Sequence, residues 1–192
     1  MEKTAAFEHE VIKEIKNRKS GRAYLEKPVE EEKLHIILEA ARWAPSSSNE
    51  QPWKYIVATK DNPELYHKVF EALNEGNQIW VQKVPVIIVS MARKTFLKNG
   101  APNKFALHDT GAANTLLALQ SAAIGLMAHQ MGGYDADKLR KGLNIPDDIE
   151  LASVIAVGYP ANPEELPENL RTRELAPRER YTQKEFVMTK AF

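Results

Sequence analysis

The stretch Trp43-Ala44-Pro45-Ser46-Ser47-Ser48-Asn49-Glu50-Gln51-Pro52-Trp53 separates an amphipathic helical pattern from an apolar strand pattern. Connections between elements usually run to about six residues or fewer, so this one is long and chemically crowded. Its prolines restrict the backbone and remove donors, while its serines and amides offer hydrogen bonds in many directions. The stretch is therefore either a serine-rich turn or a rigid loop that holds a flat ligand with polar edges.

The sequence on both sides of this loop alternates between helical and strand periodicity. Apolar stripes predict helices near residues 11–18, 34–41, 65–73, 105–126 and 135–142. Runs rich in valine and isoleucine predict strands at 53–58, 84–91 and 151–158, and a short strand leads to Gly132-Gly133. The alanine-rich helix at 105–126 is expected at the centre of the molecule.

Length and composition bound the class of protein. A chain of 192 residues predicts one domain, residues 1–192, in which the proline-bearing and highly charged segment 160–192 forms an extended arm. The 26 basic and 26 acidic residues cancel, which argues against nucleic acid or an anionic membrane as a partner. The chain has no cysteine and its five histidines show no paired spacing, so we expect no metal site. No signal sequence or membrane-length run is present, and the cytoplasm is the expected location.

Two basic clusters and a glycine pair complete the chemically suggestive segments. Asn17-Arg18-Lys19-Ser20-Gly21-Arg22 and Arg178-Glu179-Arg180 are each either a phosphate clamp or a solvated run of charge. For the first cluster, spacing alone favours a solvated helix end. The pair Gly132-Gly133 is either a tight turn or a point where the backbone approaches a ligand closely.

Taken together in this order, these segments resemble the nitroreductase family of flavoenzymes, over nearly the whole chain. The resemblance rests on the two basic clusters, Asn77, the strand at 84–89, the helix ending in Gly125-Leu126, the glycine pair and Val157-Gly158-Tyr159-Pro160. The run from Pro45 to Trp53 is its most specific part. Some family members have a lysine where this chain has Trp80, and a glutamate where it has Gly132.

The resemblance implies an α+β fold, with a central mixed sheet flanked by helices, in a homodimer with a domain-swapped C-terminal arm and one FMN at each of two interface sites. It assigns the FMN phosphate and ribityl chain to Arg18 and Ser20, with Arg178 and Arg180, and the pyrimidine edge to Arg22 and Asn77. Gly132 and Gly133 would direct backbone N–H groups to the N5 side. The loop residues would come from the partner subunit: Pro45, Ser46, Ser47, Ser48 and Asn49. The remaining residues expected at the cofactor are Lys19, Gln51, Gln130 and Met131.

The same resemblance implies an oxidoreductase in which NADH or NADPH gives a hydride to flavin N5. A small-molecule acceptor such as a nitroaromatic or quinone would then take the hydride in a ping-pong exchange. The flavin carries this chemistry, so no catalytic side chain is assigned, and His108 and His129 are candidate proton donors by type alone. Two alternatives stay open: a flavin-binding protein without NAD(P)H turnover, and a different flavin chemistry, such as enone or carbonyl reduction, on the same scaffold.

Overall fold

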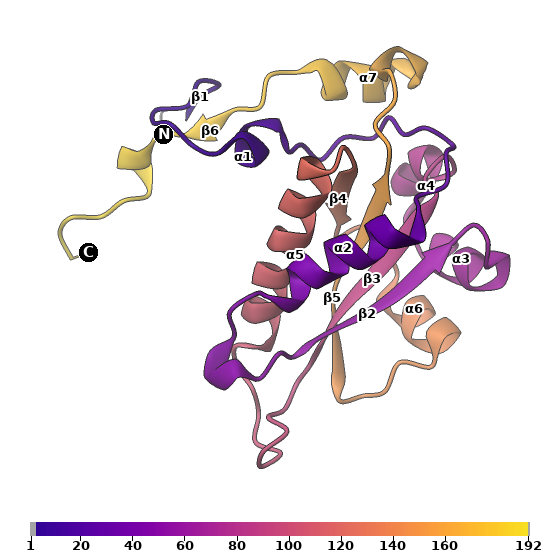
Figure 1. Cartoon of the computed structure of the whole chain (residues 1–192), viewed down its shortest axis with the longest axis vertical. Helices are drawn as coiled ribbons and strands as arrows, with labels where there is room; N and C mark the ends of the chain where they lie inside the picture. The colour runs from indigo at the N-terminus through magenta and orange to yellow at the C-terminus, as the bar shows by residue number, and fades with distance from the viewer. Residues whose placement is uncertain (1–2, 192) are drawn as a thin grey trace.

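A four-stranded antiparallel sheet forms the centre of the chain in the computed structural model, which describes residues 3–191 (Figure 1). The strands lie in the order β2 (Trp53–Thr59), β3 (Val86–Arg93), β5 (Ile149–Gly158) and β4 (Met127–Met131). Every residue of β3 is buried, which explains why that segment reads as a continuous run of aliphatic residues instead of an alternation.

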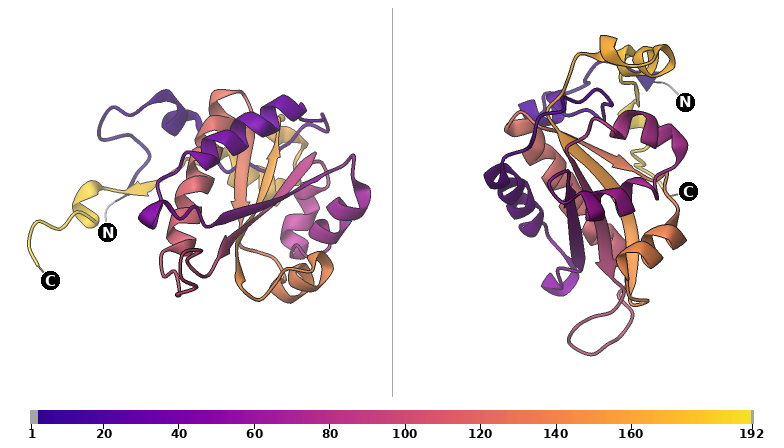
Figure 2. Two further views of the ribbon diagram at one scale, coloured as in Figure 1. Left: turned by 60° about the horizontal axis from the view of Figure 1, so that its bottom comes forward. Right: turned by 90° about the vertical axis from the view of Figure 1, so that its right-hand side faces the viewer.

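Helices cover both faces of this sheet (Figure 2). One face packs against α2 (Glu31–Arg42) and α5 (Ala106–Ala123), with Val86 and Ile88 of β3 in that core. The other face packs against α3 (Pro63–Phe70), α4 (Glu75–Val81) and α6 (Ala136–Leu143), and receives Ile87 and Val89. Successive residues of a strand point to opposite faces, so β3 supplies both cores at once.

Segments near the two ends of the chain pair with each other beside the central sheet and its helices. The short helix α1 (Lys13–Asn17) lies near the N-terminus, and α7 (Glu168–Leu175) lies in the C-terminal segment. Strand β1 (Lys3–Thr4) pairs antiparallel with β6 (Arg180–Tyr181), apart from the central sheet (Figure 1). Segments about 180 residues apart in sequence therefore lie side by side.

The structure confirms the predicted class of helices flanking a central sheet and corrects several details. All pairings among the described strands are antiparallel, so the expected mixed sheet is not found within this chain. Two helices were not predicted. α4 is seven residues long and contains Gly76, and α7 is polar, with Leu170 as its buried residue, so neither shows an apolar stripe. The first helix is shorter than expected, and Ile12 and Ile15 are exposed instead of buried.

Candidate functional site

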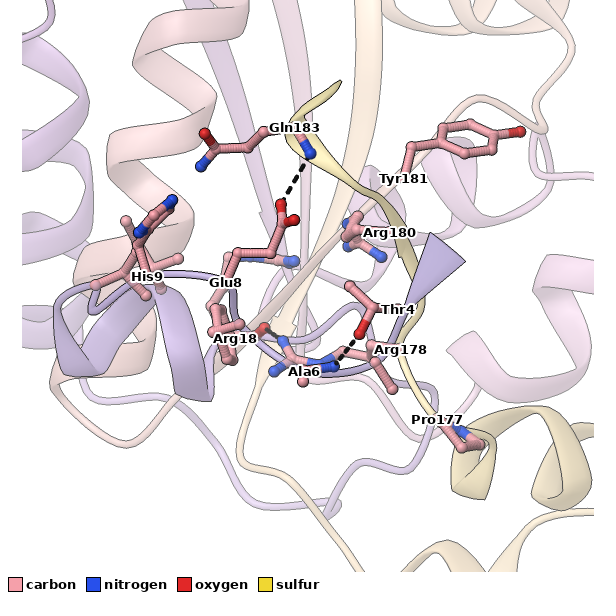
Figure 3. Close-up of a pocket in the computed structure, with 14 residues that line it drawn as sticks. Thr4, Ala6, Glu8, His9, Arg18, Pro177, Arg178, Arg180, Tyr181 and Gln183 are labelled. Carbon is pink, nitrogen blue, oxygen red and sulfur yellow. Dashed lines mark hydrogen bonds between the residues drawn. The ribbon is translucent and has the colours of Figure 1, made fainter. Parts of the chain in front are cut away.

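Three arginines expected to hold a phosphate share one cavity. Arg18, Arg178 and Arg180 line a hollow of about 460 Å³ between residues 4–9 and the C-terminal segment (Figure 3). Arg178 donates to the backbone carbonyls of Lys16 and Arg18, and Arg18 Nη1 donates to Ser20 Oγ at 3.3 Å. Burial, followed by repulsion from Arg178 and Arg180, lowers the pKa of the Arg18 guanidinium. An anion bound here would relieve that repulsion.

The next part of the basic cluster is held by a residue that sequence reasoning missed. Glu174 of α7 has a side chain only 2% exposed, and its Oε1 lies 3.3 Å from Lys19 Nζ. Its Oε2 accepts the backbone N–H of Arg22 at 2.9 Å. Lys19 and Arg22 are therefore anchored to the C-terminal segment. No local pattern in sequence links α7 to residues 18–22, because 152 positions separate Glu174 from Arg22.

The glycine pair lies at the far end of β4 from this cluster. His129 of β4 approaches Gly21 O through Nδ1 at 2.9 Å, and Gly132 lies three residues further on, about 10 Å along the chain. Asn77 Nδ2 donates to Gly133 O at 2.9 Å. A Cβ on Gly133 would stand 2.8 Å from that amide nitrogen, so any other residue here would push the Asn77 amide away. Strand β4 thus connects the Gly21–Arg22 segment, through His129, with the Asn77–Gly133 contact just beyond its end.

Gln130 and Met131 differ in what they can offer a ligand. Gln130 is exposed, and its Oε1 accepts from Asn114 Nδ2 at 3.1 Å and from Ser153 Oγ at 3.2 Å. Met131 is 3% exposed and packs in the core between the sheet and α3, α4 and α6. Its side chain is therefore committed to the core, so that a ligand could reach Met131 only through its backbone.

The loop of residues 45–51 has an unusual backbone. Ser48, Asn49 and Gln51 all have φ between 50° and 55°, a region that glycine populates more readily. Contacts hold the loop there: Ser46 Oγ accepts Gln51 N at 3.0 Å, and Asp109 Oδ2 accepts Ser47 N at 2.9 Å. Several strained residues held by surrounding contacts are typical of a ligand-binding loop.

A buried ion pair fixes the last part of this loop. Glu50 Oε1 lies 2.6 Å from Arg93 Nη2 at the end of β3, and both side chains are about one-tenth exposed. The same oxygen accepts Leu97 N at 2.6 Å, and these hydrogen bonds lower the pKa of Glu50. The loop is therefore rigidly attached to its own chain.

Helix α5 separates this loop from the basic cluster. Asp109, which binds the loop, lies in the first turn of α5, whereas Arg18 and Lys19 share a small cavity with Ala122 near its other end. Thirteen residues of helix correspond to about 20 Å. One chain thus does not bring residues 45–51 to the same place as Arg18, Ser20, Arg178 and Arg180.

The remaining candidates divide between core and surface. Trp80 is 3% exposed and stacks on His129, with ring centroids 4.9 Å apart, and on Tyr24 at 5.9 Å. Burial lowers the pKa of His129 and favours its neutral form. The side chain of His108 is 79% exposed beside Asp109. Across residues 3–191, no helix is both long and apolar enough to cross a membrane, and no group of three or more acidic or histidine side chains could hold a metal ion.

Comparisons with known proteins agree on one family. The sequence model described as "Nitroreductase family" matches residues 15–79 and 60–159. A Methanothermobacter thermautotrophicus protein provisionally named NADH dehydrogenase/NAD(P)H nitroreductase is 33% identical over 170 residues, which cover 86% of this chain and 82% of that protein. The "FMN reductase [NAD(P)H]" of Bacillus subtilis is 29% identical over 174 residues, covering 80% of this chain and 67% of the relative. A crystal structure described as an "oxidoreductase containing FMN" superimposes with a TM-score of 0.91 at 33% identity, over 97% of this chain and 95% of its own.

Proposed function

Because this chain belongs to the nitroreductase family, we propose that it is an FMN-dependent oxidoreductase that uses NADH or NADPH to reduce a nitroaromatic or a quinone. The observation that carries the proposal is the cavity in which Arg18, Arg178 and Arg180 converge. Burial, followed by repulsion from Arg178 and Arg180, lowers the pKa of Arg18 there, and a bound anion would offset that repulsion.

The residues present fit FMN along its length. The three arginines and Ser20 would hold the phosphate and ribityl chain, and Arg22 and Asn77 would contact the pyrimidine edge. The Asn77 amide packs against Gly133, and the space beside Gly132 is open, so backbone N–H groups of this pair would be directed to the N5 side. A cation such as Arg22 near N1 favours the reduced cofactor, because negative charge develops at that position.

We propose that the loop of residues 45–51 completes the site on a second copy of the chain. The loop lies about 20 Å along α5 from the arginines of its own chain. The exposed side of α5 supports such a pairing: Asp109, the one charged residue of the helix, is buried, while Leu107 is 48% exposed. An apolar helix with a bare face suits an interface between subunits. We further propose that residues 1–192 act as one domain and that the domain-swapped part of the arm of residues 160–192 is its end after Tyr181, because Glu174 and Arg178 contact residues 16–22 of their own chain.

When bound, FMN would supply the redox chemistry, namely ping-pong hydride exchange at N5 between the nicotinamide and the acceptor. The chain contributes position and charge: rigid loops hold the ring, and guanidinium groups stabilise developing negative charge. A cytoplasmic location, where NADH and NADPH are regenerated, suits this activity and is part of the proposal.

The visible absorption spectrum of the purified protein, followed by anaerobic NADH or NADPH, tests this function. We expect a yellow protein whose flavin absorbance bleaches on addition of nucleotide and returns when a quinone is added. A yellow protein that refuses both nucleotides would favour a flavin-binding protein without turnover or a different flavin chemistry. A colourless protein that takes up no added FMN would refute the proposal.

A further inference from the structure

One peptide group in the basic cluster is held from both sides. The peptide between Gly21 and Arg22 presents its carbonyl to His129 Nδ1 at 2.9 Å and its N–H to Glu174 Oε2 at 2.9 Å. His129 belongs to β4 and Glu174 to α7, so the central sheet and the C-terminal segment each form a hydrogen bond with the same peptide group. We call this arrangement of His129, Glu174 and the Gly21–Arg22 peptide the peptide clamp.

Any side chain at position 21 would displace the side chains packed around the clamp. A Cβ built on Gly21 would lie 2.4 Å from Glu174 Oε1 and 2.5 Å from Met127 Sδ. Gly21 is buried, and its backbone is not in the left-handed region, so the close approach of Glu174 is the reason for glycine here. The clamp therefore depends on glycine at position 21, although the backbone conformation there would accept other residues.

The clamp also places one buried carboxylate between two cationic side chains. The Glu174 side chain is 2% exposed, and its carboxylate faces Lys19 at 3.3 Å and Arg22 Nη1 at 3.9 Å. Its Oε1 is buried without a hydrogen-bond partner, although the Lys19 ammonium lies within ion-pair distance. His129 is fixed in turn by its stack on Trp80. A buried carboxylate kept beside two cations influences any charge that develops next to Arg22.

We propose that Glu174 is a positioning residue for the flavin, acting through the peptide clamp, and that it links docking of the C-terminal segment to cofactor binding. The hydrogen bond to Arg22 N fixes where the Arg22 side chain leaves the backbone, and the carboxylate offsets part of the Arg22 charge. Glu174 thus strengthens FMN binding by pre-organising the loop, and makes the bound flavin harder to reduce by opposing negative charge near N1. This inference rests on the proposed function.

Two substitutions separate position from charge. Glu174→Ala removes the acceptor, so we expect FMN affinity to fall about tenfold, the effect of losing a charge-assisted hydrogen bond. Glu174→Gln keeps an acceptor for Arg22 N and should recover most of that affinity, while the loss of negative charge raises the midpoint potential of the bound flavin. Fluorescence titration of FMN and anaerobic potentiometry measure the two effects. Glu168→Ala, an exposed position on the same helix, is the matched control and should change neither.

Hydrogen exchange of the FMN-free protein gives a readout independent of the cofactor. Peptides covering residues 18–24 should lose protection in Glu174→Ala and regain it in Glu174→Gln. Wild-type affinity and protection in Glu174→Ala would overturn the clamp, and an unchanged potential in Glu174→Gln would overturn its electrostatic role. A wild-type protein that binds no FMN would overturn the proposed function and this inference with it, whereas wild-type binding with silent variants would overturn this inference alone. If Glu174→Ala fails to fold, Glu174→Gln and the hydrogen exchange of residues 18–24 decide.

Discussion

Replacing Asn114 with alanine tests how the polar network under α5 supports the fold. Asn114 is 1% exposed, and its Oδ1 accepts hydrogen bonds from Tyr55 and Ser90, each at 2.9 Å. Its Nδ2 donates to Gln130 Oε1 at 3.1 Å and to Ser153 Oγ at 3.3 Å. Burial raises the pKa of Tyr55, so its hydroxyl stays protonated and acts as the donor.

The expected cost of Asn114→Ala follows from the groups left without partners. The Ser90 hydroxyl is fully buried, and a buried donor without an acceptor costs about 1–3 kcal/mol. The Tyr55 hydroxyl is partly accessible and loses a hydrogen bond of about 1 kcal/mol. We therefore expect a loss of about 2–4 kcal/mol in the free energy of unfolding, which in a chain of this size lowers Tm by roughly 5–15 °C.

A double-mutant cycle with Ser90→Ala checks the mechanism. Ser90→Ala removes the orphaned hydroxyl, so Asn114→Ala should cost about 1–2 kcal/mol less in that background than in the wild type. Urea unfolding of the four proteins, at equal concentration and without added FMN, measures the cycle. A cost below about 1 kcal/mol for Asn114→Ala, or additivity within about 0.5 kcal/mol, would refute the reasoning.

Three further outcomes are expected. Burial, the largest cause, lowers the pKa of His129, so the unfolded chain binds more protons than the folded one as pH falls through the ordinary value of 6.5. Stability should therefore fall as pH falls below about 7, and His129→Gln should flatten the pH dependence of the urea midpoint. Gly21→Ala should destabilise the protein because its Cβ would collide with Glu174. Gly76→Ala, in a helix with open space around it, should stabilise the protein by about 0.5–1 kcal/mol. Equal urea midpoints for the two variants would contradict the packing argument. Deleting residues after Tyr181 should weaken dimerisation, and an unchanged sedimentation coefficient would show that the arm does not hold the partner.

The sequence predicts those parts of the molecule whose signal is local. The valine- and isoleucine-rich β3, the long α5 and the crowded loop of residues 45–51 all lie near their predicted residue ranges because each carries its own pattern. The expectation that α5 lies at the centre of the molecule is wrong, since it packs on one face of the sheet. α7 carries no such pattern, since it is polar and buries little beyond Leu170. Ile12 and Ile15 have the spacing of a buried helical face, but no other part of the described chain covers their side chains.

The candidate site was harder to predict where it depends on long-range contacts. Arg18, Arg178 and Arg180 were predicted together through resemblance, and the structure brings them into one cavity. Glu174 could not be predicted, because nothing near it in sequence indicates that it will meet Arg22 across 152 positions. Asn114 was missed for the same reason, as its four partners come from four different strands.

The central claim is that each flavin site combines the basic cluster of one subunit with the loop of residues 45–51 from the other. Mixing two inactive proteins tests it most directly: one with Arg18→Ala and Arg180→Ala, the other with Ser46→Ala and Ser48→Ala, unfolded and refolded together. If the site is shared, half of the randomly formed dimers contain one intact site out of two, so about one quarter of wild-type FMN binding and NAD(P)H oxidation should return. Recovery near that fraction is the predicted result, and a mixture as inactive as its separate components would show that both groups act within a single chain.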